Sequence, residues 1–396
     1  MDNLLISGVN TRAMVNSALK LDYNLFSTSY YRTYDFKNIP NEKHILKQSE
    51  NKTCNTLEDN YSSDKLLKLS EDYLENIDYI ILVSGLNPSD FNGKFKKYKK
   101  KILGNKNIEK IENKFDFYNK IKNKYCIPET FKINDIDEAN EIIKNNEKKQ
   151  YIIKPLKGFG GYGVNFLNTE SINQLNDMKN QWIIQEYVEG ENISSSVLST
   201  KKDSKTIINS RNLNENDYKN DESFIYSGNL LPLNKEILKK NNSSNILKEM
   251  DEISEDLIKD FNLIGSNGVD YILDNEDNLH IIEVNPRFQG TYESCESLLN
   301  INLLEAHIKA CQNELIEINN KIKGYSLKKI IYAENKVKIK NLESLKNVYD
   351  IPYPNVIIEK NQPIATIIQE NKSINKLNEN LKISFNEFKK HLLKIV

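Results

Sequence analysis

Two acidic side chains are expected to face each other across a hairpin in the second half of the chain. Apolar runs on either side of the polar stretch 275–278 predict two strands joined by a four-residue loop. Such a loop pairs Asp274 with Leu279. The same register pairs Asp270 with Glu283, which places the two carboxylates opposite each other. Like charges in that arrangement repel unless a cation lies between them, and this indicates a metal site.

Three further polar side chains are expected on the same face of the second strand as Glu283. Asn285 lies two residues after Glu283, and side chains two residues apart on a strand share a face. Asp, Glu and Asn oxygens are hard ligands of the kind that Mg²⁺ prefers. Arg287 and Gln289 extend the same spacing, within reach of a phosphoryl group during its transfer. The alternative is an acidic strand that faces solvent, but the strongly apolar flanking residues favour the metal site.

A lysine followed by four glycines forms a second candidate site. An aromatic and β-branched run at 151–153 leads to Lys154, and four glycines follow within six positions, at Gly158, Gly160, Gly161 and Gly163. Glycines allow positive φ angles and a close approach of the backbone, so that consecutive N–H groups can bind phosphate oxygens. Lys154 would add a fixed positive charge beside an α- or β-phosphate. The lysine precedes the glycines, so this is not a Walker A loop, and a flexible glycine-rich hairpin turn is the alternative.

The elements that position these residues begin with a βα pattern in the first hundred residues. Apolar runs at 4–9, 24–30 and 78–83 predict strands with helices between them, which indicates a parallel α/β sheet. No GxGxxG motif follows the first strand, so a dinucleotide fingerprint is missing. The stretch 42–64 is polar and poorly periodic and is predicted to be mostly a surface loop.

A threonine and an arginine follow the first predicted strand. Open α/β sheets bind ligands at the C-terminal ends of their strands, so we expect Thr11 and Arg12 to hold part of a non-nucleotide substrate. The alternative is a helix-capping threonine beside a surface arginine. Arg211 is expected to face the cleft that binds this substrate.

The pattern of predicted strands and helices changes toward the C-terminal end of the sequence. Strands and helices alternate again to about residue 316, with hairpin signals that the first domain lacks. Short β-like runs then lie among prolines, and a final helix is predicted at 383–395. This tail is interpreted as a small appended α+β domain.

Composition excludes several classes of protein. A chain of 396 residues suggests about two to four domains. Hydrophobic residues at 38% and charged residues at 28% exclude collagen-like and mostly disordered chains. A formal charge of -1 argues against a nucleic-acid partner. Four scattered cysteines without a CxxC pair are interpreted as free thiols.

Targeting signals are also missing from the sequence. No stretch reaches the roughly 20 apolar residues of a membrane helix, and the start lacks the basic region of a signal peptide. The expectation is a cytoplasmic protein with no membrane partner.

The lysine–glycine motif and the acidic hairpin, in this order, resemble the ATP-grasp superfamily across roughly residues 100 to 310. The resemblance implies two α+β subdomains that close on ATP. It divides the chain into an N-terminal parallel-sheet domain that precedes the ATP-grasp core (1–105), a small subdomain with the glycine loop (106–184), a large subdomain with the metal site (185–316) and a small C-terminal α+β domain (317–396). The fold class is α/β, with an α+β central part.

The resemblance also assigns roles to individual residues. Asp270, Glu283 and Asn285 resemble the ligands of Mg²⁺, with Mn²⁺ as a permitted substitute, and Arg287 resembles the arginine that steadies an acyl-phosphate. Lys114 and Lys154 match the two family lysines that contact the ATP phosphates. The four glycines match the loop that covers the phosphates, and Glu186, Tyr187 and Val188 match the hinge that binds adenine. The ribose contact falls on Glu191 or Asn192.

Within the superfamily, the start of the chain, the segment 193–196 and the tail resemble archaeal predicted carboligases related to biotin carboxylase. The implied reaction uses ATP to convert a carboxylate into an acyl-phosphate, which an amine or other nucleophile then attacks. One rival is a carboxylase that uses bicarbonate, and another is a protein that senses ATP without turnover. The acid, the nucleophile and the oligomeric state stay open, and a homodimer is compatible with the sequence.

Overall fold

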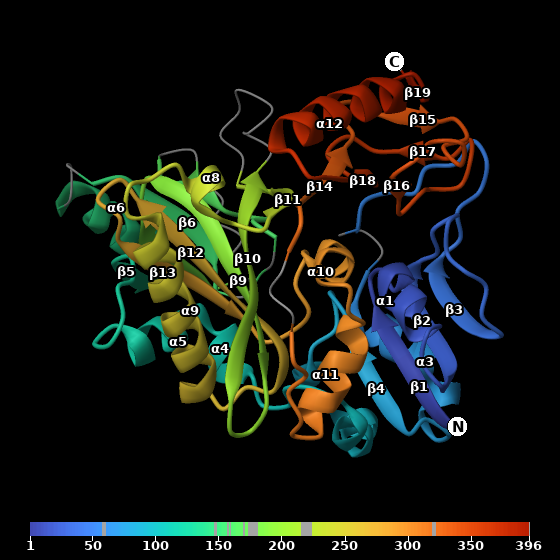
Figure 1. The fold of residues 1–396 in the computed structure, drawn as a ribbon, viewed down its shortest axis with the longest axis horizontal. Coiled ribbons are helices and arrows are strands. Elements are labelled where there is room, and N and C mark those ends of the chain that lie inside the picture. The colour runs from blue at the N-terminus through green and yellow to red at the C-terminus, as the bar shows by residue number, and fades with distance from the viewer. Residues whose placement is uncertain are drawn as a thin grey trace.

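A computed structural model of the chain describes every residue except 58–60, 146–148, 157, 159, 169–170, 173–180, 215–223, 319–321 and 396. Its elements form four sheets with helices packed around them (Figure 1). Lys157 and Phe159 of the glycine loop lie outside the described residues.

The N-terminal segment forms the predicted parallel sheet. Its strand order is β3-β2-β1-β4, and all three pairings are parallel. The strands are β1 (Asp2–Gly8), β2 (Tyr23–Tyr31), β3 (Asn41–Leu46) and β4 (Tyr79–Leu82), with helices α1 (Arg12–Ala18) and α3 (Ser63–Leu74). Leu4, Leu5 and Ile6 are at most 1% exposed, as expected for a strand covered on both faces. β3 corrects the loop predicted at 42–64, because its six half-buried residues show no alternation that a sequence pattern would reveal.

The segment with the glycine loop forms a separate antiparallel sheet in the order β5-β8-β6-β7. The strands are β5 (Thr130–Ile133), β6 (Tyr151–Pro155), β7 (Asn165–Phe166) and β8 (Trp182–Glu186), and the helices are α4 (Glu109–Glu112), α5 (Lys114–Ile121) and α6 (Ile136–Asn145). Its small core includes Tyr151, Ile153 and Ile184. The glycine loop connects β6 to β7, so its two ends are fixed by neighbouring strands.

An eight-stranded sheet carries the acidic hairpin, in the order β13-β12-β9-β10-β11-β14-β18-β16. Its strands are β9 (Gly190–Ser199), β10 (Ser204–Asn214), β11 (Tyr226–Leu231), β12 (Gly265–Asp274), β13 (Leu279–Asn285), β14 (Tyr325–Tyr332), β16 (Val348–Tyr349) and β18 (Pro363–Asn371). Helices α8 (Lys235–Leu238), α9 (Ser243–Asp260), α10 (Tyr292–Leu299) and α11 (Leu303–Cys311) accompany it.

The C-terminal segment continues this large sheet through β14, β18 and β16. It also holds a three-stranded sheet of β15 (Val337–Ile339), β17 (Ile357–Ile358) and β19 (Leu392–Lys394), and the helix α12 (Ile374–Lys389) packs on β18 and β14 (Figure 1). The final helix predicted at 383–395 is therefore displaced, because Leu392–Lys394 pairs with β15 as a strand. The four domain boundaries stay a prediction.

The hairpin register differs from the predicted one at the loop and agrees with it at the carboxylates. Leu273, not Asp274, pairs with Leu279, because Ile282 forms a bulge between the pairs Tyr271–Ile281 and Asp270–Glu283. The extra residue shifts the register by one, and Asp270 therefore still faces Glu283.

Two further expectations can be compared with the described residues. Cys54, Cys126, Cys295 and Cys311 are all free thiols, as predicted. Within the described part of the chain, none of the helices is both long enough and apolar enough to cross a bilayer.

Candidate active site

A cavity of about 870 Å³ is lined by the glycine loop, the hinge after β8 and the acidic hairpin. Fourteen of the residues singled out from the sequence line it: Lys114, Lys154, Gly158, Gly160, Gly161, Glu186, Tyr187, Val188, Asn192, Asp270, Glu283, Asn285, Arg287 and Gln289. The other five, Thr11, Arg12, Gly163, Glu191 and Arg211, are not part of its lining. The tertiary structure thus brings together segments that lie more than 100 residues apart.

The proposed metal ligands lie on one wall of this cavity. Asp270 pairs across the strands with Glu283, and Asn285 Nδ2 donates a hydrogen bond to Asp270 Oδ2 at 2.7 Å. Arg287 Nη2 donates to Asn285 Oδ1 at 3.0 Å, so the arginine is held beside the set. Burial, and then the charge of Glu283, raise the pKa of Asp270 to about 7.

This donor set fits a hard divalent cation. Two carboxylates face one cavity, and the pKa of Asp270 is raised by burial first and by the charge of Glu283 second, so a cation beside them would stabilise the ionised form. Among the described residues no group of three or more His, Cys, Asp or Glu side chains is arranged to hold a metal, and the third oxygen donor here is the amide of Asn285. Two carboxylates and an amide suit Mg²⁺, which keeps several waters and binds substrate phosphates as well.

Lys154 lies deep in the cavity on β6. Its side chain is 4% exposed, and its Nζ donates to Tyr118 Oη at 2.9 Å and to Gln185 Oε1 at 2.6 Å. Burial lowers its pKa to about 8, although the charge of Glu283 acts in the opposite direction. A buried ammonium whose hydrogen-bond partners are both neutral favours the binding of an anion beside it.

The buried ammonium of Lys154 predicts proton uptake when a nucleotide binds. At pH 8.5 a pKa of about 8 leaves much of the side chain uncharged, and an adjacent phosphate raises that pKa, so a proton is taken up. Calorimetry of Mg·ADP binding in two buffers of different ionisation enthalpy should show clear uptake at pH 8.5, where Asp270 is already ionised. At pH 7 Lys154 is mostly charged, and Asp270, with a pKa of about 7, should release a proton to the solvent when the metal binds. Lys154→Arg stays charged and should abolish the uptake. Equal uptake in that variant would assign the proton to another group.

Lys114 connects the glycine loop to the acidic hairpin. It is the first residue of α5, and its Nζ lies 3.6 Å from Glu283 Oε1 and donates to the carbonyl of Gly158 at 3.4 Å. Two cations, Lys114 and Lys154, therefore flank the space between the loop and the carboxylates. This arrangement suits the negatively charged tail of a nucleotide.

The glycine loop rests directly on β11. The Tyr226 N–H donates to the carbonyl of Gly160 at 3.1 Å. Gly161 has φ +79°, and a Cβ at this position would lie 2.0 Å from the carbonyl oxygen of Phe224. Only glycine allows this close approach, so the closed position of the loop depends on it.

Gly161→Ala is expected to lift the loop from β11. The methyl group meets backbone that cannot move aside, and the left-handed φ costs about 1–2 kcal/mol in addition. We expect roughly a tenfold rise in the Kd for Mg·ADP, since 1.4 kcal/mol corresponds to a factor of ten. The midpoint of thermal unfolding should stay nearly unchanged.

Gly160→Ala is the matched control for this substitution. Gly160 has a similar φ of +64°, but a Cβ there would approach nothing closer than 3.5 Å. It should carry the conformational cost without the collision. Equal Kd values for the two variants would show that contact with Phe224 does not hold the loop.

The hinge after β8 supplies a slot with apolar walls. The ring of Tyr187 meets Phe166 edge to face at 4.9 Å and lies 6.3 Å from Phe224. Ile272 and Ile282 line the same cavity. Glu186 is paired with Lys149 at 3.1 Å. A flat heterocycle fits between such walls.

The two candidates for a ribose contact lie on opposite faces of β9. Asn192 lines the cavity, whereas Glu191 points away and lies 3.7 Å from Arg211. Strand alternation is the reason, because neighbouring side chains leave opposite faces. Of the two, Asn192 is the residue with access to a ligand.

The same alternation turns Arg211 away from the cavity. Arg211 is half-exposed beside Glu191, and its neighbour Asn212 lines the cavity instead. Asn212 Oδ1 accepts hydrogen bonds from Ser194 Oγ at 3.0 Å and Asn229 Nδ2 at 2.7 Å, and its side chain also bonds to Asp270. Sequence reasoning singled out Arg211 and missed Asn212, because strand alternation sends these two neighbouring side chains to opposite faces.

Thr11 and Arg12 lie in the interior beside the N-terminal sheet. Both are 1% exposed. Thr11 Oγ1 lies 2.8 Å from Ser27 Oγ, and Arg12 pairs with Asp350 at 2.8 Å and Glu293 at 2.8 Å. The surface arginine considered as an alternative is also not what the structure shows, because carboxylates from distant segments enclose Arg12.

Comparisons with known proteins agree with this geometry. A family model described as the ATP-grasp domain matches residues 111–291. An uncharacterized protein from Methanocaldococcus jannaschii is 31% identical over 376 residues, covering 92% of this chain and 87% of that protein. The tyramine–L-glutamate ligase of the same organism is 28% identical over 323 residues, covering 78% and 81%. The fold matches biotin carboxylase from Campylobacter jejuni with a TM-score of 0.75 at 14% identity, covering 99% and 91%.

Proposed function

The chain belongs to the ATP-grasp family, and from this premise we propose that it is an ATP-dependent ligase that joins a carboxylate to an amine. The observation that carries the proposal is the single cavity shared by the acidic hairpin, two lysines and the glycine loop. A related chain is named tyramine–L-glutamate ligase, which supports an amine as the nucleophile.

The proposed reaction proceeds in two steps. An oxygen of the substrate carboxylate attacks the γ-phosphorus of ATP, and ADP leaves. The amine nitrogen then attacks the acyl carbon, inorganic phosphate leaves, and the nitrogen loses a proton as the amide forms. Such phosphoryl and acyl transfers need positioned charges more than covalent help from the protein.

Each side chain of the cavity has a proposed part in this reaction. Lys114 and Lys154 hold the phosphates, and the loop from Gly158 to Gly163 covers them. Arg287 stabilises the charge on the transferred phosphoryl group. Asp270, Glu283 and Asn285 would hold Mg²⁺, which when bound neutralises phosphate charge. Gln289 contacts the substrate carboxylate from the same wall.

The nucleotide base and ribose have proposed partners as well. Glu186 and the backbone of Val188 recognise adenine, with Tyr187 in the wall of the slot. Asn192 contacts the ribose. A cytoplasmic location and a homodimer stay predictions, as do the substrate roles of Thr11, Arg12 and Arg211.

A screen for ADP release tests the proposal. Mg·ATP is incubated with pools of carboxylates and amines, beginning with L-glutamate and tyramine because of the related ligase. Release that requires both an acid and an amine is the expected result. If no pair releases ADP while ATP still raises the melting temperature, the protein binds nucleotide without catalysis. Release that requires only bicarbonate and biotin would identify a carboxylase.

A further inference from the structure

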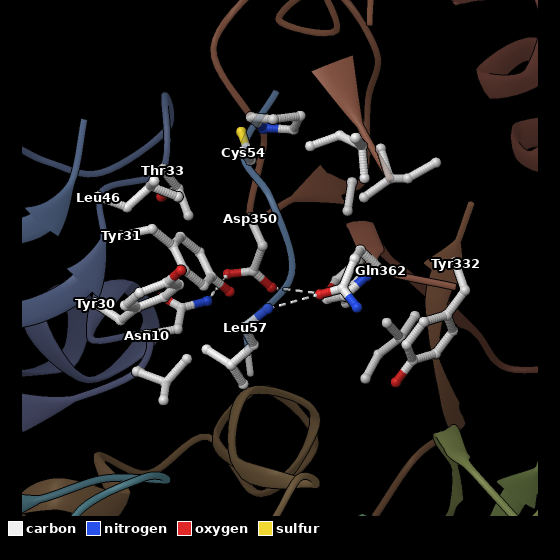
Figure 2. A pocket seen from close by; sticks show the side chains of 18 of the residues that line it. Asn10, Tyr30, Tyr31, Thr33, Leu46, Cys54, Leu57, Tyr332, Asp350 and Gln362 are labelled. Carbon is white, nitrogen blue, oxygen red and sulfur yellow. Dashed lines mark hydrogen bonds between the residues drawn. The ribbon is translucent and has the colours of Figure 1, made fainter. Parts of the chain in front are cut away.

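A second cavity of about 300 Å³ lies between the N-terminal sheet and the C-terminal segment (Figure 2). Its walls include residues at the ends of β2 and β3, the loop after β3, and the start of β18. Tyr162, Lys328, Ile330 and Tyr332 line both this cavity and the nucleotide cavity. The two spaces therefore adjoin at these four side chains.

The second cavity is mainly aromatic and aliphatic. Figure 2 shows Tyr30, Tyr31 and Leu46 on one side and Leu57 lower in the view. The rings of Tyr30 and Tyr31 meet edge to face, with centroids 6.0 Å apart and an interplanar angle of 85°. A further ring placed among them can adopt the same favourable geometry. The volume lies at the lower end of the range for small-molecule pockets, about 300–1,000 Å³.

One end of this cavity is polar and built from a buried carboxylate. Asp350 accepts hydrogen bonds from Asn10 Nδ2 at 2.7 Å and Thr366 Oγ1 at 2.7 Å. Although burial alone raises its pKa, the charge and hydrogen bond of Arg12 bring the pKa of Asp350 well below the ordinary value. An ionised carboxylate therefore stands at this end (Figure 2).

The ionic network around this end carries more negative than positive groups. Three carboxylates surround two cations, the members being Asp35, Glu293, Asp350, Arg12 and Lys328. Of these five, Asp350 and Lys328 line the cavity, and the other three lie behind its wall. The net charge of the network favours a cationic or neutral guest over an anionic one.

We propose that this cavity binds the body of the amine substrate, and that this body is aromatic, as in an arylalkylamine. The inference rests on the proposed ligase function. The ring lies among Tyr30, Tyr31 and Leu46, and the amino group extends along the common wall at Ile330 and Tyr332 toward the nucleotide cavity. The amine then meets an acyl-phosphate formed beside Arg287.

Filling the cavity tests this assignment. Leu46→Trp enlarges a side chain on β3, an edge strand of its sheet, and Leu57→Trp fills the cavity from the segment after β3. Lys47→Ala is the matched control, because Lys47 is exposed and next to Leu46 but outside the lining. Binding of phenethylamine and of butylamine is measured by calorimetry in the presence of Mg²⁺ and a non-hydrolysable ATP analogue. The Kd of that analogue reports whether each variant is folded.

Phenethylamine should bind wild type more tightly than butylamine, and each tryptophan variant should weaken phenethylamine binding at least tenfold. Lys47→Ala should bind like wild type, and the nucleotide analogue should bind all variants alike. Unchanged phenethylamine binding in both filled variants would overturn the proposal. So would preferential binding of 3-phenylpropionate that the same variants abolish, since the cavity would then serve the acid.

The outcome separates this proposal from the ligase function. If phenethylamine binds as expected and no acid supports ADP release, the cavity is a site for an aromatic amine and the ligase proposal fails. If amines support equal ADP release in wild type and in both filled variants, the ligase proposal stands and the cavity assignment fails.

Discussion

Glu283→Gln is expected to reduce ADP release by about 10³-fold while leaving the stability of the nucleotide-free protein nearly unchanged. A bound metal supplies several kcal/mol of transition-state stabilisation, and each 1.36 kcal/mol corresponds to a tenfold change in rate. Glutamine retains the shape of the side chain but loses the charge that a divalent cation needs. ADP release is measured at saturating Mg²⁺ with the substrate pair found in the screen.

Stability should change little in this variant. Removing the charge of Glu283 relieves its repulsion with Asp270 across the hairpin, but it also removes the partner of Lys114 at 3.6 Å. Because these two effects oppose each other, the melting temperature of the metal-free protein should stay nearly unchanged. Glu276→Gln is the matched control, because Glu276 is exposed in the turn of the same hairpin. Wild-type turnover in Glu283→Gln would remove the metal assignment.

Arg12→Ala is expected to lower the free energy of unfolding by about 3–5 kcal/mol, the typical cost of removing one partner from a buried ion pair. The guanidinium is 1% exposed and lies 2.8 Å from Asp350, 2.8 Å from Glu293 and 3.4 Å from Asp35. Without it, three partly buried carboxylates face one another with only Lys328 nearby. Urea denaturation followed by circular dichroism measures the change.

The role of Arg12 links segments that are far apart in the chain. Glu293 lies 281 residues away on α10, and Asp350 lies 338 residues away in the C-terminal segment. The arginine thus joins the N-terminal sheet to two other parts of the molecule. At temperatures where the variant is folded, the KM for the acid should be unchanged, because Arg12 does not line the nucleotide cavity. A raised KM with normal stability would instead support the substrate role predicted from the sequence.

Arg211→Ala is the matched control for this loss. Arg211 is half-exposed, and the carboxylate of Glu191 lies 3.7 Å from it; such surface pairs contribute about 0–1 kcal/mol. A similar loss of stability in both variants would show that burial of the Arg12 pairs is not the cause.

The sequence alone determined the residues of the candidate site that depend on local periodicity. The position of Asn285 on the same side as Glu283 follows from alternation along one strand. Asp270 faces Glu283 as predicted only because the bulge at Ile282 offsets the difference in register at the loop. The glycines between Lys154 and β7 are local as well, because a backbone with positive φ can be recognised from residue type. These features need only neighbours a few residues apart.

Only the tertiary structure decided what depends on distant partners. The bulge at Ile282 changed the loop register, β3 formed against β2 without an alternating pattern, and β14 and β18 joined the sheet of the acidic hairpin. Arg12 became a buried ionic centre because Glu293 and Asp350 come from other parts of the chain. The second cavity exists only where these parts meet. Packing between remote segments, unlike strand alternation, leaves no periodic signal in the sequence.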